Sequence, residues 1–445
     1  MLLEKEEAGN LIKKILSYSK AESATAYLDG SNSLNLRFAL NTVSTCGAIN
    51  SISANIISNF GKRSGTVRMT SVEDEIIEKG VRQSEEIARL SPENEEFMPP
   101  LEKQDRYLEV NEFFENTDKL VPQNISDKVS YTLKKAIDKD LQAAGYFENE
   151  TAFSSIGNTK DMFAYHKRTT AEFSTTVRTS DGKGSSKINR SYADINLLNV
   201  NKFSDNVIDK AVMSRDPKRH EPGKYVTILD NAAVSDIIDN LIGYMNKRSA
   251  DEGRSFFSEK NNQNKIGQTI GDARVNIFSD PQNKYAPASP FSDDGYPVFK
   301  RDWIKEGVLK NLYSGRYWAK KTNTEYVPYP TNIIMTGTGK SVEDLIASTE
   351  KGVFVSRLWY IRSVDQRQML LTGLTRDGVF LIENGKITRA INNYRFNESP
   401  INIIKNIVDM SVSEKVVGSE TGNSRIVVPA LKLSEFNFST ISDAI

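Results

Sequence analysis

The chain has 445 residues, enough for two to four domains of ordinary size, and its 58 lysines and arginines balance its 58 aspartates and glutamates. A net charge of zero argues against a generally basic nucleic-acid binder and against a polybasic membrane-surface protein. The single cysteine, Cys46, and two histidines, His166 and His220, exclude a disulfide framework and a cysteine-rich zinc site.

Hydropathy points to a protein without membrane segments. No stretch approaches the roughly 18 apolar residues of a membrane-spanning helix, and the first ten residues are charged where a signal peptide would be apolar. We therefore expect a cytoplasmic location. A hydrophobic content of 38% with 26% charged residues is typical of a folded globular protein.

The first predicted unit, residues 1–90, is an N-terminal α/β domain. Apolar residues at helical spacing predict a helix before residue 18, and alternating residues predict strands between residues 24 and 72. Asp29-Gly30 is interpreted as a turn, and Cys46 as a small buried side chain. A second helix is expected over residues 73–90.

Residues 91–125 are predicted to be an exposed acidic connector. Between residues 91 and 118 there are nine acidic residues against two basic ones, and prolines interrupt regular structure. A central domain, 126–221, follows. Ser126 is the expected N-cap of its helix, and strands at about 171–180 and 185–198 form a hairpin around residues 181–184.

The last predicted unit is a C-terminal β-rich domain, 222–445. It begins with a strand at Tyr225–Leu229, continues with a regular apolar helix from Val234 to Met245, and contains a hairpin at Glu383-Asn384-Gly385. Ser399-Pro400 opens a further helix. The predicted fold class is therefore α+β, a β-rich multi-domain protein with an N-terminal α/β unit and a middle helix-plus-hairpin unit.

Several short motifs could carry chemistry, but each has a plainer explanation. Gly337 to Ser341 looks like the end of a phosphate-binding loop, yet Ile334 stands where that loop needs glycine. His220-Glu221 runs into Pro222-Gly223, which stops a zinc-binding helix. Asp293-Asp294-Gly295 is interpreted as a turn before a strand at Pro297 to Phe299. The residues taken alone therefore indicate no active site.

Five strings in the C-terminal third occur in an order and spacing similar to those of a known family. They are Ser292–Pro297, Ile304–Leu309, Pro330–Asn332, Lys351–Val355 and Gly378–Ile387. In these strings the chain resembles the TldD/PmbA family, first called modulators of DNA gyrase and now regarded as two-subunit cytosolic zinc metalloproteases. The resemblance extends more weakly over the whole chain.

The resemblance also implies where zinc ligands would stand. In the catalytic subunit of the family, a helix carries H-E-x-x-x-H and a later cysteine is thought to complete the site. Here Asp239 stands at the first histidine, Asn240 at the glutamate and Tyr244 at the second histidine, and the C-terminal region has no cysteine. Aspartate can bind zinc, but tyrosine replaces imidazole poorly and asparagine cannot act as a general base. We therefore expect no catalytic residue and no zinc in this chain.

This pattern is most similar to the TldE/PmbA type of subunit, which lacks the zinc motif. The resemblance implies a heterodimer with a TldD-like catalytic subunit that carries the zinc and cleaves unfolded or extended peptides, with neither nucleic acid nor membrane as a partner. Free strand edges would hold peptide by main-chain pairing. Two alternatives stay open: a stand-alone homodimeric peptide-binding or scaffold protein, and a peptidase with a carboxylate-rich metal site that includes Asp239.

Overall fold

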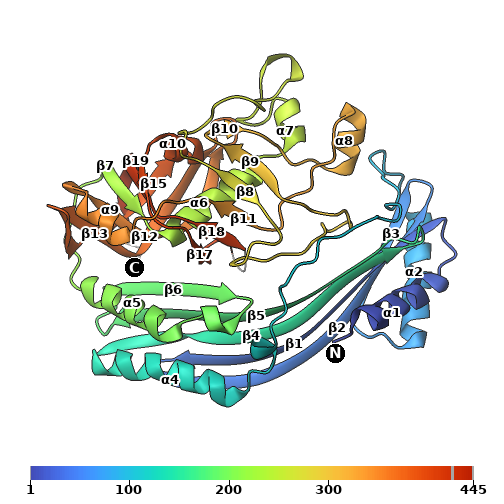
Figure 1. Ribbon diagram of the computed structural model, residues 1–445, viewed down its shortest axis with the longest axis horizontal. Helices are drawn as coiled ribbons and strands as arrows, with labels where there is room; N and C mark the ends of the chain where they lie inside the picture. Colours follow the sequence, from blue (N-terminus) through green and yellow to red (C-terminus); the bar gives the residue numbers. More distant parts are fainter. Residues whose placement is uncertain (1, 422–424, 443–445) are drawn as a thin grey trace.

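The computed structural model describes residues 2–421 and 425–442. It has two layers: a long curved sheet lies beneath a C-terminal region that contains two further sheets (Figure 1). The predicted β-rich α+β class is confirmed.

The long sheet has six strands in the order β3-β2-β1-β4-β5-β6. They are β1 (Ser23–Ala39), β2 (Thr42–Phe60), β3 (Arg63–Met69), β4 (Leu141–Asn158), β5 (Phe163–Thr179) and β6 (Ser185–Tyr192). All neighbours are antiparallel, and β1 pairs with β4 from Thr25↔Asn158 to Phe38↔Gly145. The N-terminal and central units predicted from the sequence therefore share one sheet, because β1 and β4 pair across the predicted connector.

The first hairpin turns later than its sequence indicates. Asp29 and Gly30 lie inside β1, so the predicted turn there is wrong. The chain reverses at Leu40 and Asn41, whose φ angles are 48° and 59°. The left-handed region is unfavourable for leucine, so a leucine in the sequence does not indicate a turn. The predicted hairpin at residues 181–184 is confirmed, since β5 pairs with β6 around Gly182 at φ 71°.

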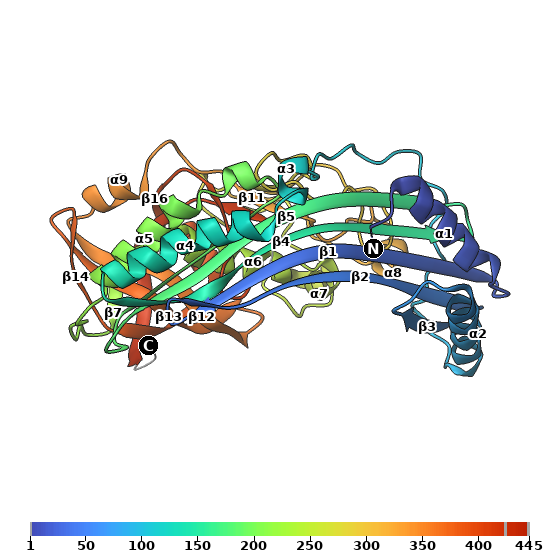
Figure 2. The same cartoon turned by 90° about the horizontal axis from the view of Figure 1, so that it is seen from below.

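Helices cover the face of this sheet that points away from the C-terminal region (Figure 2). They are α1 (Lys5–Ser17), α2 (Asp74–Leu90), α4 (Pro122–Asp138) and α5 (Val200–Met213), and a single turn α3 (Glu115–Asp118) precedes α4. Ser126 is not an N-cap, because α4 begins four residues earlier with Pro122 in its first turn. The Asn124 side chain accepts a hydrogen bond from the Val121 N–H at 3.1 Å and closes that end.

One C-terminal sheet has the order β10-β9-β8-β11-β18-β17. Its strands are β8 (Ile277–Ser279), β9 (Arg301–Lys305), β10 (Val308–Leu309), β11 (Ile333–Met335), β17 (Glu414–Val416) and β18 (Ile426–Val428). The strand predicted at 297–299 is wrong, because Pro297 makes only an isolated bridge to Phe291 and the strand begins at Arg301.

The other C-terminal sheet curls into a small barrel, since β12 pairs with both β7 and β13. Its strands are β7 (Gly223–Leu229), β12 (Lys351–Asp365), β13 (Leu370–Glu383), β14 (Lys386–Ala390), β15 (Asn393–Glu398), β16 (Ile407–Met410) and β19 (Leu431–Ser442). The predicted hairpin after β13 is confirmed: Asn384 and Gly385 have φ angles of 51° and 72°.

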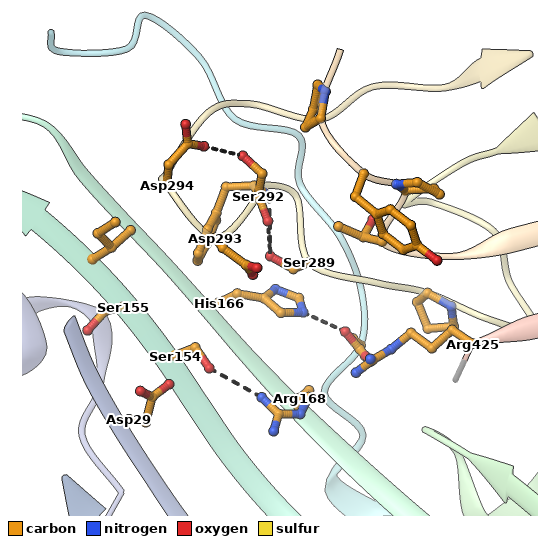
Figure 3. Close-up of a pocket in the computed structure, with 18 of the residues that line it drawn as sticks. Asp29, Ser154, Ser155, His166, Arg168, Ser289, Ser292, Asp293, Asp294 and Arg425 are labelled. Atoms are coloured by element: carbon orange, nitrogen blue, oxygen red, sulfur yellow. Dashed lines mark hydrogen bonds and ion pairs between the residues drawn. The ribbon is translucent and has the colours of Figure 1, made fainter. Parts of the chain in front are cut away.

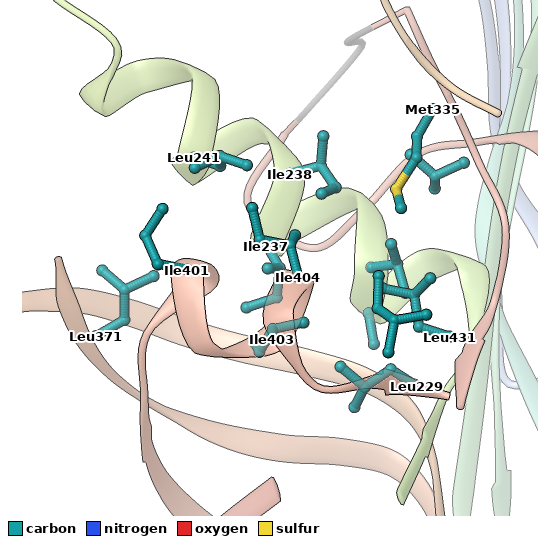
Figure 4. Close-up of a cluster of buried hydrophobic side chains, with 14 of the residues drawn as sticks. Leu229, Ile237, Ile238, Leu241, Met335, Leu371, Ile401, Ile403, Ile404 and Leu431 are labelled. Carbon is teal, nitrogen blue, oxygen red and sulfur yellow. The ribbon is translucent and has the colours of Figure 1, made fainter. Parts of the chain in front are cut away.

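Helices α6 (Asn231–Tyr244) and α10 (Pro400–Lys405) pack against the barrel, and Ile237, Ile404 and Leu431 are fully buried where they meet (Figure 4). Ser399 caps α10 by accepting from the Ile401 N–H, as its sequence predicts. The shorter helices are α7 (Lys247–Asp251), α8 (Arg316–Thr322) and α9 (Val342–Ala347). None of the helices in the described residues is long and apolar enough to cross a membrane.

Candidate functional site

A cavity of about 1060 Å³ lies between the inner face of the long sheet and the C-terminal region. Its lining combines β1, β4, β5 and β6 with the connector, with two C-terminal segments around residues 287–294 and 315–331, and with Lys415 and Arg425. Segments far apart in the sequence therefore meet at one polar site.

The floor of the cavity is a row of side chains on adjacent strands (Figure 3). Asp29 lies opposite Ser154, and Ser154 lies opposite His166, so these three residues of β1, β4 and β5 share one face. Arg168 donates to the Ser154 hydroxyl at 3.4 Å. Strand alternation therefore places an acid, an alcohol, an imidazole and a guanidinium side by side.

Carboxylates continue this row toward β6. Glu148 and Glu150 on β4 and Glu172 on β5 also line the cavity, and Glu148 lies directly opposite Glu172. Burial, and after it the charges of Glu150 and Glu172, raises the pKa of the Glu148 carboxyl. Glu172 accepts a short hydrogen bond from the Tyr146 hydroxyl. This part of the cavity is acidic.

The roof includes the turn at residues 292–295. Gly295 has a φ of 84°, and the Ser292 hydroxyl donates to an Asp294 carboxylate oxygen at 2.6 Å. Tyr326 donates to the same carboxylate at 3.2 Å, and Arg316 lies 3.7 Å from it. The predicted turn is confirmed, and its residues Asp293 and Asp294 line the cavity.

Glu112 of the connector is a buried anchor between the two layers. Its side chain is 3% exposed, and its carboxylate lies 2.6 Å from His166 Nε2 and 2.6 Å from an Arg425 nitrogen. Burial alone would raise the pKa of Glu112, but Arg425 and His166 offset this and hold it below its usual value. The connector is mostly exposed, as expected, but at Glu112 it joins the sheet to the C-terminal region.

Lys415 on β17 also lines the cavity, and it is only 7% exposed. Its ammonium lies 5.6 Å from the centre of the Tyr192 ring. Burial and the nearby Arg425 lower the pKa of Lys415 to about 8, although Glu112 and Glu172 act in the opposite direction. A cationic group is therefore held in a desolvated position beside the acidic row.

Helix α6 carries Asp239, Asn240 and Tyr244, the three positions that the resemblance aligns with the zinc motif. Asp239 is half-buried, and burial followed by the charge of Asp239 raises the pKa of the cavity residue Tyr329. The Asn240 amide donates to the Asp236 carbonyl at 2.8 Å within the helix. Tyr244 packs against the barrel core. Only Asp239 thus approaches the cavity, behind Tyr329.

Asp236, on the same helix, has a structural role that its sequence does not indicate. Its carboxylate is fully buried and accepts from the Ser419 and Glu420 N–H groups at 3.1 and 2.9 Å. Burial raises the pKa of Asp236 to about 7 in spite of these bonds. Asp236 therefore fastens the segment after β17 to α6.

The C-terminal half of the chain is similar to a known protein family. The model of the PmbA/TldA metallopeptidase C-terminal domain matches residues 222–440. This stretch contains the barrel, α6 and the roof of the cavity.

The chain belongs to the TldD/PmbA family.

Solved structures share the whole fold. TldE from Thermococcus kodakarensis superposes with a TM-score of 0.85 at 17% identity, over 97% of this chain and 99% of that one. A Thermotoga maritima protein named as a candidate modulator of DNA gyrase gives 0.84 at 16% identity, over 97% and 99%. A Bacteroides thetaiotaomicron protein of the same description gives 0.85 at 17%, over 99% and 100%. At these identities the likeness shows the fold. No curated protein sequence matches the chain.

The zinc motif of TldD/PmbA catalytic subunits does not fit the side chains on α6. The Asn240 NH2 group donates within its own helix and Tyr244 packs against the barrel core, so Asp239 is the one carboxylate among the three positions. Among the described residues, no group of three or more His, Cys, Asp or Glu side chains is arranged to hold a metal ion. A zinc site needs at least three such protein ligands.

The histidines and the cysteine lie away from α6. His166 is in the cavity floor, whereas His220 Nδ1 lies 2.8 Å from the Tyr394 hydroxyl and its ring lies 4.9 Å from Tyr225. Cys46 is exposed on β2, so its predicted burial is wrong. Residues 42–51 of β2 are exposed on both faces.

β3 pairs with β2 only from Ala54 to Phe60, so the part of β2 before Ala54 pairs only with β1 in the described part of the chain. No charged residue occurs between Phe38 and Phe60, although charged side chains on an edge strand normally prevent it from pairing with another chain. Residues 42–53 thus form a free strand edge.

Proposed function

We propose that this TldD/PmbA family member is the non-catalytic, TldE-type subunit of a cytoplasmic zinc metallopeptidase, and that its cavity receives unfolded or extended peptide. The observation that carries the proposal is the set of side chains on α6 at the positions of the zinc motif. The helix that the resemblance aligns with the family's metal-binding helix carries Asp239, Asn240 and Tyr244; the Asn240 NH2 group donates within the helix and Tyr244 packs against the barrel core.

The cavity supports the peptide part of the proposal. Its volume of about 1060 Å³ is at the upper end of ordinary ligand pockets, which measure about 300–1,000 Å³. Hydroxyl groups and carboxylates of the sheet can accept peptide N–H groups, and the aromatic rings of Tyr27, Phe291 and Tyr317 offer apolar contact. Such a lining would hold peptides with little regard to sequence.

The test is reconstitution with a TldD-type protein that carries the intact H-E-x-x-x-H helix. We expect a 1:1 complex by light scattering, zinc bound by the partner, and cleavage of an unfolded peptide that requires both chains. A partner whose two motif histidines are replaced serves as the matched control and should give complex without cleavage. About one zinc per chain in the isolated protein, with peptidase activity that a chelator abolishes, would refute the proposal.

The free edge of β2 favours a second candidate, a homodimeric peptide-binding or scaffold protein. Two copies could pair their uncharged edges antiparallel and extend the sheet. Light scattering of the isolated chain separates the two: a stable homodimer that does not exchange with a TldD-type partner supports the scaffold. Loss of that dimer in Ala48→Lys, which places a charge in the edge, would locate the interface.

A further inference from the structure

The Lys415 ammonium is a buried cation, and the described part of the chain gives it no ion-pair partner. No carboxylate among residues 2–421 and 425–442 lies within ion-pairing distance of it, and its ammonium lies over the Tyr192 ring, 5.6 Å from the ring centre. A charged group in a desolvated site is costly unless it is paired. Because Lys415 lines the cavity, a ligand can supply the missing charge.

The carboxylates nearest to Lys415 are already engaged. Glu112 is bound by His166 and Arg425, and Glu172 accepts from Tyr146. Their charges reach Lys415 through space, but neither provides a direct partner. The site therefore retains the capacity to bind one more anion.

A second cation lies on the same face. Lys415 is directly opposite Val427 in the β17–β18 pair, and Arg425 is two residues before Val427, so Lys415 and Arg425 are diagonal neighbours. Arg425 keeps donors besides those bound to Glu112, because its guanidinium has five N–H groups. Together they can bind both oxygens of one carboxylate.

The rest of the cavity indicates which carboxylate this is. Its lining contains eight acidic residues but only four lysines and arginines, which are Arg168, Arg316, Lys415 and Arg425. A ligand with many acidic side chains would be repelled by this excess. A peptide with neutral or basic side chains and one negative group at its end matches the charge distribution.

We propose that Lys415 and Arg425 form a subsite that binds the C-terminal carboxylate of a peptide held in the cavity. This inference rests on the proposed function, because it takes peptide as the occupant. It also gives the direction of the bound peptide: the C-terminal end lies beside β17, and the preceding residues extend over the acidic row of β4 and β5.

The experiment uses the full chain and a labelled peptide of Gly, Ser and Lys residues, measured by fluorescence anisotropy. Three forms are compared: a free C-terminal carboxylate, a C-terminal amide, and the amide with one internal Glu. We expect amidation to weaken binding at least about tenfold, and Lys415→Met to weaken binding of the free acid equally while leaving the amide unchanged. Lys310→Met, at an exposed lysine outside the cavity, is the matched control.

The outcomes are distinct. Equal binding of free acid and amide, or an unchanged affinity in a folded Lys415→Met variant, overturns the subsite and leaves the proposed peptide function standing. Recovery of affinity by the internal Glu in the amidated peptide shows that the site accepts a side-chain carboxylate and overturns the terminal assignment. Absence of binding for every peptide counts against both. Lys415→Gln repeats the test if thermal unfolding shows that Lys415→Met is not folded.

Discussion

Replacement of Glu112 by glutamine tests the anchor between the two layers. The substitution keeps the shape of the side chain but removes the charge that faces His166 and Arg425 at 2.6 Å each. Loss of one member of a buried ion pair typically costs about 3–5 kcal/mol, because the other member stays buried and unpaired. Arg425 is 27% exposed and recovers part of its hydration, so we expect about 3 kcal/mol.

Urea unfolding at pH 7, followed by intrinsic fluorescence, measures this loss. Glu115→Gln is the matched control: Glu115 lies three residues further along the connector, and its pairing with Lys119 is exposed, so no measurable change is expected.

Acid pH gives a second readout of the same anchor. The folded-state pKa of Glu112 is depressed, so its stabilisation is present above the unfolded pKa and is lost as pH falls through the folded value. The difference between wild type and Glu112→Gln should therefore shrink below about pH 4. A loss under about 1 kcal/mol at pH 7, or an equal loss at pH 7 and pH 3, would refute the reasoning.

Three further predictions concern single positions. Burial lowers the pKa of Lys415 to about 8, so the unfolded chain holds that proton more tightly, and wild type should gain stability relative to Lys415→Met between about pH 8 and 10. A pH-independent difference in urea midpoints would contradict this. Ile404→Ala removes a fully buried side chain between α6 and α10 and should cost about 3 kcal/mol in urea unfolding, whereas Ile137→Ala, at a position 59% exposed, should cost little; similar losses would show that Ile404 is not a core residue. Gly385→Ala forces a φ of 72° and brings a Cβ within 2.6 Å of the Ala347 carbonyl, so it should lower the melting temperature. Gly243→Ala, in open space on α6, is its control and should not lower it.

Local patterns predicted much of the fold. The apolar spacing of α6, the Ser399-Pro400 start of α10 and the Asn384-Gly385 turn each have a short-range physical cause, and each is confirmed. The wrong predictions also came from local patterns, because these contain no information on strand pairing. Asp29-Gly30 has turn composition but is held in β1 by pairing on both sides, and Leu40 accepts a left-handed conformation because the two long strands on either side of it fix the hairpin.

The candidate site was largely hidden from the sequence because distant segments build it. Glu112, His166 and Arg425 are separated by tens to hundreds of residues, and nothing in their local sequence pairs them. One signal was present: Glu112 lies beside two aromatic residues of the acidic connector, Phe113 and Phe114. The family resemblance pointed to α6 as the helix to inspect, which stays a prediction, and it carried no information on Lys415.

The anchor at Glu112 also has a consequence for how the chain is made. Arg425 lies 313 residues after Glu112, so at a synthesis rate of about 5–20 residues per second the carboxylate waits at least about 15 seconds for that partner. During this interval the long sheet can form and bind the connector, since Thr169 on β5 already donates to the Glu112 carbonyl at 2.9 Å. The cavity closes only when the last strands dock. Assembly of the two layers is therefore a late folding step, and the ion pair between Glu112 and Arg425 forms only at that step.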